Sequence, residues 1–214
     1  MSVVLDNLDV YLRGLLVTVE LTLLSYAIAF AIGAVVAAFR VSPVPPLRAL
    51  GTVYVGLVRN TPLAVLFILF FFGFPKLGLT YSPFLSALVV LSVYTGAFMT
   101  ETIRAGINTV AGGQADAARA VGLTSVQTMG LVVLPQALRS VVPPLGNLFI
   151  ALAKNTSIAS LISVAELVHR SDQLVTDTAQ PLAVLAGVAV AYLILTLPSG
   201  LLFGALERRV AVRR

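Results

Sequence analysis

The chain has 214 residues, 58% hydrophobic and 11% charged, with a mean hydropathy of +1.00 and a net charge of +5. A soluble domain carries about 25% charged residues, so this composition excludes one and predicts an integral membrane protein, embedded in lipid. The positive charge needs no nucleic-acid partner, because basic residues of membrane proteins collect on the cytoplasmic side. The absence of cysteine excludes disulfides, thiol chemistry and a cysteine metal site.

Five apolar stretches are each long enough to cross a hydrocarbon core, which takes about 20 residues. The first follows Asp6 and Asp9 without the positive region of a cleaved signal peptide, so we expect it to stay as a membrane span. Proline and glycine turn signals separate the stretches. The sequence predicts an all-α integral membrane protein, a single domain over 12–208 with spans at about 12–39, 49–74, 84–108, 137–161 and 182–206.

Charge predicts how the spans are oriented. With five spans, the two ends of the chain lie on opposite sides of the membrane. One side carries only three basic residues, Arg13, Lys76 and Arg170. The other carries nine, which are Arg40, Arg48, Arg104, Arg119, Arg139, Arg208, Arg209, Arg213 and Arg214. The positive-inside rule therefore predicts an external N-terminus and a cytoplasmic C-terminus.

The polar gap between the third and fourth apolar stretches is rich in alanine, which favours helix. Gly122 is placed to end this helix, and Thr124 with Gln127 forms a capping-box signal for the next one. We therefore expect a small helix outside the bilayer. Its smooth face would consist of Ala115, Ala118 and Gly122.

This gap, residues 112–135, resembles the EAA loop of bacterial ABC-importer permeases. The family pattern is Glu-Ala-Ala, three residues, Gly, nine residues, then Ile-x-Leu-Pro; here Asp116 replaces the Glu and Val132 replaces the Ile. The resemblance implies a cytoplasmic coupling helix that docks on an ATP-binding subunit. The residues it implies for docking are Gln114, Asp116, Ala117, Ala118, Arg119, Gly122 and Pro135. The alternative is a solvated interfacial helix with no partner.

Most of the remaining chain is similar to the polar amino-acid uptake branch of these permeases, in the segments 58–63, 105–110, 144–147 and 153–160. The likeness implies an ABC type-1 transmembrane domain with five transmembrane helices and the coupling helix between spans three and four. Further segments, 40–44, 195–198 and 207–212, resemble actinobacterial glutamate-importer permeases. Glutamate or a close relative is the expected cargo, with glutamine, arginine and histidine as alternatives.

The chain is expected to be a transport subunit rather than an enzyme, because it has no Gly-x-x-x-x-Gly-Lys-Ser/Thr phosphate loop. The resemblance implies three partners: an ATP-binding cassette subunit that holds ATP and Mg²⁺, an extracytoplasmic solute-binding protein, and a second permease chain, related or identical, with a heterodimer expected. The setting would be the bacterial cytoplasmic (plasma) membrane. No cofactor or metal is expected in this chain, since its one histidine, His169, has no second ligand at metal-site spacing.

Charged residues within the spans are candidates for the transport path, because each costs at least about 2.5–3.5 kcal/mol near the bilayer centre. Arg59 lies about 15 Å into the second span at 1.5 Å per residue, and Lys154 lies at a similar depth in the fourth. Glu20 and Glu101 are the acids available to balance them. The path candidates are Arg59, Asn60, Thr61, Glu101, Lys154, Asn155, Thr156 and Ser157. The alternative is that the two cations only pair with these acids or with helix-end carbonyls.

Two other functions stay open at the level of sequence. An ion-coupled secondary carrier or channel would work without ATP, but the chain lacks the strong internal repeat of many such carriers. A membrane scaffold would use its intramembrane charges for assembly alone.

Overall fold

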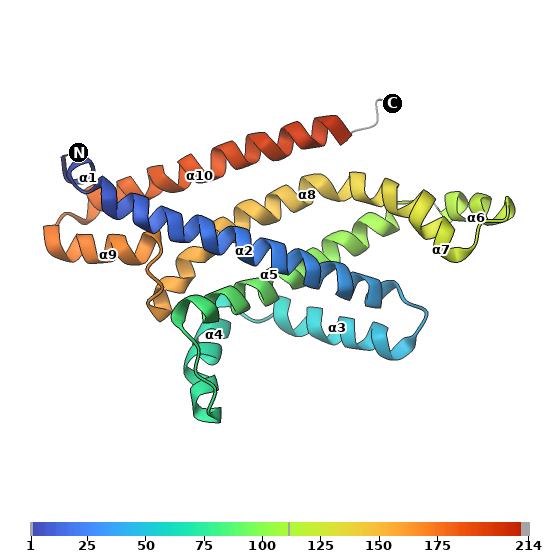
Figure 1. The fold of residues 1–214 in the computed structure, drawn as a ribbon, viewed down its shortest axis with the longest axis horizontal. Helices are drawn as coiled ribbons and strands as arrows, with labels where there is room; N and C mark the ends of the chain where they lie inside the picture. The colour runs from blue at the N-terminus through green and yellow to red at the C-terminus, as the bar shows by residue number, and fades with distance from the viewer. Residues whose placement is uncertain (1, 111, 211–214) are drawn as a thin grey trace.

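The computed structural model describes residues 2–110 and 112–210, which form an elongated bundle of helices (Figure 1). The N-terminus and α9 lie at one end of the bundle, and α6 and α7 lie at the other. The α-helices of the first half are α1 (Ser2–Asp6), α2 (Leu8–Val41), α3 (Pro45–Arg59), α4 (Leu63–Ile68) and α5 (Pro83–Asn108). Those of the second half are α6 (Gly112–Ala120), α7 (Ser125–Thr128), α8 (Leu134–Asn155), α9 (Leu167–Thr178) and α10 (Pro181–Val210).

Four short segments differ from α-helix. Two are π-helical, η1 (Leu69–Gly73) and η3 (Met129–Val133), and two are 3₁₀-helical, η2 (Phe74–Leu77) and η4 (Thr156–Ile162). Each π-helical segment ends two residues before a proline, at Pro75 and Pro135. A proline has no N–H to donate, so the backbone ladder is interrupted there and can widen. The Leu134 N–H accordingly donates to the Met129 carbonyl, five residues back.

Four helical stretches of the described chain are long and apolar enough to cross a membrane: α2, α5, residues 139–162 and α10. The predicted second span, 49–74, is wrong as a continuous helix, because α3 and the segment from Leu63 to Leu77 meet at a bend of 102°. Counted as one span, this bent pair brings the total to five.

The bend has a local cause in the sequence Asn60-Thr61-Pro62. Pro62 cannot continue the backbone ladder of α3, and it disfavours the helical conformation at Thr61. The side chains of Asn60 and Thr61 donate to the carbonyls of Gly56 and Leu57, at 2.7 and 2.8 Å. These bonds satisfy carbonyls that the ending helix leaves free, so the bend is stabilised by its own residues.

The centre of the bundle is the packing of α2 against α5. The helices approach closely at glycines: a Cβ added at Gly33 would lie 2.6 Å from the Cβ of Met99, and one added at Gly96 would lie 2.9 Å from Ile32. Small residues allow such an approach. Because α5 leads directly to α6, this packing fixes where the polar segment begins.

Candidate functional site

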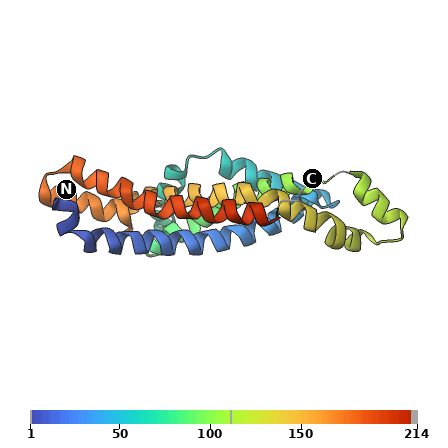
Figure 2. The ribbon, with the colours of Figure 1, turned by 90° about the horizontal axis from the view of Figure 1, so that it is seen from above.

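The polar segment 112–135 extends beyond the bundle at one end (Figure 2). Its predicted local structure is confirmed: α6 ends at Ala120, and Gly122 follows with a left-handed φ of 89°. Thr124 and Gln127 form both bonds of a capping box, at 2.9 and 3.3 Å. The segment therefore folds as a short helix, a glycine stop and a capped second helix.

The exposed face of α6 differs from the predicted one. The prediction of a free Ala118 is wrong, since this side chain is 6% exposed where α6 packs on α7 and η3 of the same chain. Ala115 is half-buried. The face left open contains Gln114, Asp116, Ala117, Arg119 and Gly122, and Pro135 is also exposed at the start of α8.

The polar segment exposes both charged and apolar groups. Asp116 and Arg119 form an ion pair one turn apart, with side chains 69% and 60% exposed. Val121 is 80% exposed and Val126 is 82% exposed. Exposed apolar residues rimmed by polar ones are typical of a surface that another protein covers.

The two predicted cation motifs both fall where an α-helix ends. Arg59 is the last residue of α3, and its guanidinium lies 5.0 Å from the ring centroid of Phe98, a cation–π contact. Lys154 is in the last turn of α8 and is exposed. The segments that follow, α4 and η4, pack against each other. The structure therefore brings the two motifs to neighbouring parts of the fold.

The hydroxyl and amide side chains of these motifs also donate hydrogen bonds to backbone carbonyls. Thr156 and Ser157 donate to the carbonyls of Ala153 and Lys154, at 2.8 and 2.7 Å. Thr156 is fully buried, whereas Asn155 is half-buried. A guanidinium, an ammonium and these polar groups can together bind a carboxylate.

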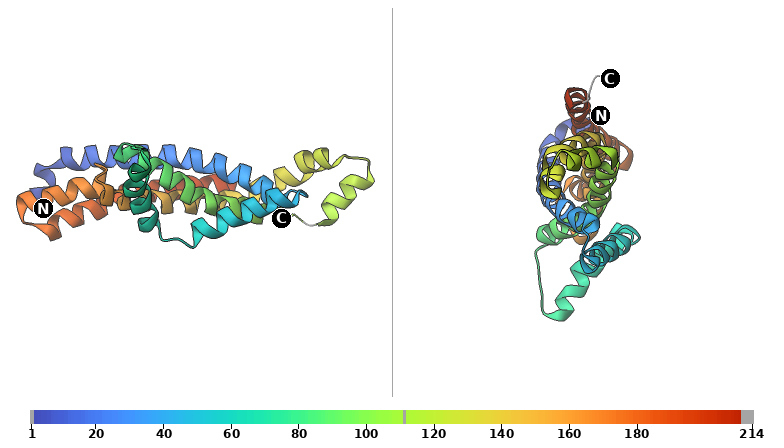
Figure 3. Two further views of the ribbon diagram at one scale, coloured as in Figure 1. Left: turned by 90° about the horizontal axis from the view of Figure 1, so that it is seen from below. Right: turned by 90° about the vertical axis from the view of Figure 1, so that its right-hand side faces the viewer.

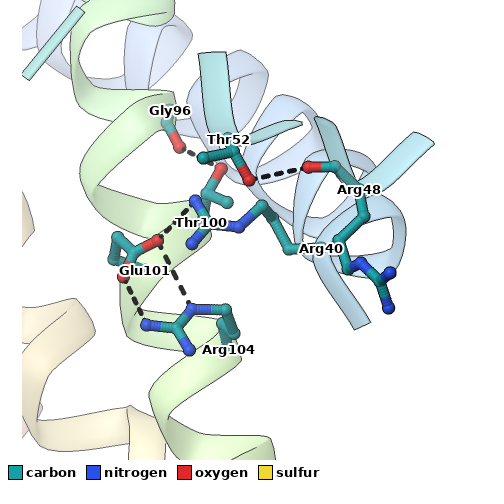
Figure 4. Close-up of polar contacts among 7 residues, drawn as sticks. All are labelled: Arg40, Arg48, Thr52, Gly96, Thr100, Glu101 and Arg104. Atoms are coloured by element: carbon teal, nitrogen blue, oxygen red, sulfur yellow. Dashed lines mark hydrogen bonds and ion pairs between the residues drawn. The ribbon is translucent and has the colours of Figure 1, made fainter. Parts of the chain in front are cut away.

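Glu101 lies in a different cluster from the one predicted (Figure 4). It forms ion pairs with Arg40 of α2 at 3.0 Å and with Arg104 of its own helix at 2.8 Å. The expectation that it balances Arg59 or Lys154 through an ion pair is wrong, because its two oxygens already hold these arginines. Glu20, the other expected acid, is exposed on α2.

Sequence reasoning missed Glu166, which is 0% exposed. Its carboxylate caps α9 by accepting from the N–H groups of Val168 and His169 at 2.9 and 2.8 Å, and Tyr192 of α10 donates to it at 3.5 Å. Burial raises the pKa of Glu166 to about 7. The signal in the sequence was an acid just before an amphipathic helix, which suits a helix N-terminus.

Within residues 2–110 and 112–210, no three His, Cys, Asp or Glu side chains gather as a metal site would require. The fold and the end-of-bundle polar segment point instead to a membrane transport subunit.

Comparison with known proteins supports this class directly. Residues 29–212 match the family described as binding-protein-dependent transport system inner membrane component. The chain is 39% identical over 209 residues to the probable glutamine ABC transporter permease protein GlnM of Bacillus subtilis, covering 98% of this chain and 97% of that one. It is 41% identical over 211 residues to the glutamate transport system permease protein GluC of Corynebacterium efficiens, covering 92% of each.

A solved amino acid ABC transporter with histidines has the same fold, with a TM-score of 0.92 and 31% identity over 96% of each chain. The chain therefore belongs to the family of binding-protein-dependent transport system inner membrane components. It is a multi-pass membrane protein and the permease of an amino-acid ABC importer, and is not itself an enzyme. The resemblance of the sequence to amino-acid ABC permeases is confirmed.

Proposed function

We propose that this permease imports glutamate or a close relative. The observation that carries the proposal is the 41% identity to a glutamate permease over 92% of the chain. The cations Arg59 and Lys154, at the ends of α3 and α8, suit a substrate with two carboxylates. Glutamine is the alternative cargo, because the glutamine permease relative is 39% identical.

The test is uptake by the whole complex, reconstituted in proteoliposomes with its solute-binding protein. We expect ATP-dependent uptake of labelled glutamate that excess glutamate suppresses more strongly than glutamine, arginine or histidine. Glutamine as the stronger competitor would favour the alternative cargo. Uptake driven by an ion gradient without ATP would instead establish a secondary carrier.

In this proposal the path runs past the two helix ends, so that Arg59→Ala impairs uptake more than assembly. Arg13→Ala, which removes an exposed arginine near the start of α2, is the matched control. Loss of the assembled complex in Arg59→Ala alone would assign Arg59 a structural role through its contact with Phe98.

The coupling role belongs to α6, α7 and η3, whose open face docks on a separate ATPase subunit that holds ATP and Mg²⁺. The supports are the EAA-like pattern at Asp116–Pro135, the projection of this segment from the bundle, and the exposed Val121 and Val126. Closure of the ATPase dimer would push on this face and switch the spans between outward-facing and inward-facing states.

Docking can be tested at Val121, which is 80% exposed, so that Val121→Glu costs the fold little. We expect this variant to insert normally but to lose the ATPase subunit on co-purification. Gln173→Glu, an exposed change on α9 at the other end of the bundle, is the control. Normal retention of the ATPase by Val121→Glu would contradict docking at this face.

The arm formed by α4, η1 and η2 is the surface we assign to a second permease chain. The arm turns away from the bundle (Figure 3). Apolar residues along it are 41–76% exposed: Val65, Ile68, Leu69, Phe72 and Leu77. Mass spectrometry of the complex purified from native membranes distinguishes a related second chain, as in a heterodimer, from a second copy, and a chain that comes out alone would contradict both.

The N-terminus is assigned to the outside and the C-terminus to the cytoplasm. The arginines near α6 support this. Arg40 and Arg104 lie near the C-terminal ends of α2 and α5, and Arg48 lies near the start of α3. Figure 1 shows these helix ends on the α6 side of the bundle, and Arg119 belongs to α6 itself. Arg213 and Arg214, used in the same prediction, lie outside the described residues. In this cysteine-free chain, Asp9→Cys should react with an impermeant maleimide on intact cells, and Gln114→Cys should not. The reverse pattern would invert the topology.

A further inference from the structure

Arg40 of α2 joins α3 to α5. Its guanidinium pairs with Glu101 of α5 at 3.0 Å, and the two side chains are 17% and 21% exposed. Its aliphatic stem packs on α3, where a Cβ added at Gly51 would lie 3.0 Å from Cγ and Cδ of Arg40. Figure 4 shows Arg40 reaching from the α2–α3 side toward Glu101. One side chain therefore contacts two helices that are not neighbours in sequence.

Two further contacts hold α3 on α5. The Tyr54 hydroxyl donates to the Val93 carbonyl at 2.7 Å. The Arg59 guanidinium lies over the ring of Phe98 at 5.0 Å. Together with the Arg40 bridge, they connect α3 to α5 at three places.

The link between α3 and α5 lies between α6 and the bend after Arg59. At its C-terminal end, α5 stops at Asn108, and α6 begins at Gly112. At its own C-terminal end, α3 stops at Arg59, immediately before the 102° bend. If a displacement of α6 reaches α5, the contacts of α5 with α3 lead from there to the bend.

We propose that Arg40 and Glu101 are positioning residues of transport, which make α3 move with α5 and so carry the ATPase stroke from α6 to the bend at Asn60–Pro62. This proposal rests on the coupling role proposed for α6. It assigns Glu101 to transmission of motion rather than to contact with the amino acid.

The cluster contains its own control. Arg40 and Arg104 both pair with Glu101, but Arg104 lies on α5 itself, three residues from Glu101. Removing Arg104 changes the charge of the cluster and leaves the bridge between helices in place. Removing Arg40 makes the same change in charge and breaks the bridge.

The experiment compares Arg40→Met with Arg104→Met in the complete reconstituted complex. The quantity measured is the number of amino acids imported per ATP hydrolysed. We expect Arg40→Met to lower this ratio at least about 5-fold, as for loss of a coupling between sites, with assembly and ATP hydrolysis retained. Arg104→Met should stay near the wild-type ratio. An equal fall in both variants, or no fall in Arg40→Met, would overturn the proposal.

Partial rescue separates positioning from folding. Arg40→Lys keeps a cation that can still reach the carboxylate, although it loses the fork geometry of the guanidinium. It should recover part of the transport ratio. If Arg40→Met does not assemble, Arg40→Lys can be compared with Arg104→Lys, which is a milder pair of changes. Equal ratios of import to ATP hydrolysis in these two variants would count against the bridge.

A distance measurement tests the link without relying on transport. The chain has no cysteine, so Val53→Cys on α3 and Ala105→Cys on α5, both exposed, allow two spin labels to be attached selectively. We expect one narrow distance, the same with and without ATP, and a broad one once Arg40→Met is added. A wild-type distance that changes with ATP would overturn the link. If α6 does not dock on the ATPase, the effect of Arg40→Met on the nucleotide-free distance still decides whether Arg40 holds α3 to α5.

Discussion

Glu101 is largely shielded from water and Glu166 is completely buried, but the protein stabilises the two carboxylates in different ways. Glu101 is 21% exposed and is held by two guanidinium groups. Glu166 is 0% exposed and accepts from two backbone N–H groups at the start of α9. Among the described residues, Glu166 has no cation within ion-pair distance.

The contrast shows what each acid can do. An ion pair between side chains of different helices can hold those helices together, so that they move as one relative to the rest of the bundle. A buried cap fixes one helix start, and burial without a counter-charge favours the protonated acid. Glu101 thus suits a moving joint and Glu166 a fixed one.

The largest effect is expected when the fixed joint is removed. Glu166→Ala leaves two N–H groups of α9 without an acceptor in a buried place. The free energy of unfolding should fall by about 2–4 kcal/mol, from loss of the cap and the unsatisfied donors. The thermal midpoint of the purified complex measures this, with Asp172→Ala on the exposed side of the same helix as control. Equal midpoints would show that the cap does not stabilise α9.

The next largest effect is a dependence of the free energy of unfolding on pH. The pKa of Glu166 is raised from 4.5 to about 7, chiefly by burial. Below pH 4.5 both the folded and the unfolded chain hold the proton, and between pH 4.5 and 7 only the folded chain does. The free energy of unfolding therefore falls as pH rises through this window, by up to about 3 kcal/mol.

Glu166→Gln removes this titration, so the midpoint of the variant relative to wild type should rise with pH across the window. Thermal scans of both proteins at a series of pH values measure it. A constant difference would mean that Glu166 is not protonated near neutral pH.

A smaller effect is expected at the moving joint. Glu101→Gln should lower the free energy of unfolding by only about 1 kcal/mol, because the ion pairs are partly exposed. Since salt screens exposed charges, high salt should narrow the gap between Glu101→Gln and wild type. The same salt should leave the gap for Glu166→Gln unchanged. Equal salt responses would remove the distinction between the two sites.

The smallest effect is expected for Tyr192→Phe. The bond from the Tyr192 hydroxyl to Glu166 is long, at 3.5 Å, so its loss should cost less than about 1 kcal/mol. A midpoint drop as large as that of Glu166→Ala would show that Tyr192, rather than the backbone of α9, holds the acid. Tyr81→Phe, an exposed change just before the start of α5, is the control.

Local signals account for what the sequence predicted well. Four spans follow from runs of apolar residues, and the structure of 112–135 follows from Gly122 and the Thr124–Gln127 cap. Each of these depends on residues within a few positions of one another. The bend after Arg59 could have been found in the same way, because Pro62 follows two residues that bond back to the backbone.

Other features depend on contacts distant in sequence. Glu101 is 61 positions from Arg40, and no pattern in the chain selects this partner over Arg59. Ala118 is buried because η3, which follows later in the chain, packs against α6. The position of Glu166 just before α9 is a local signal, but its contact with Tyr192 of α10 is not.

The π-helical segment before Pro135 sets the rotational phase of the span that follows. Each residue of an α-helix advances the chain by about 100° around the axis, and a π-helical turn takes up one residue more than an α-helical turn. If one residue were deleted between Met129 and Val133, the rest of the span would turn by about that angle. Lys154, now exposed, and Thr156, now buried, would each face a different neighbour. The length of this one turn thus decides which side chains the fourth span presents to the interior.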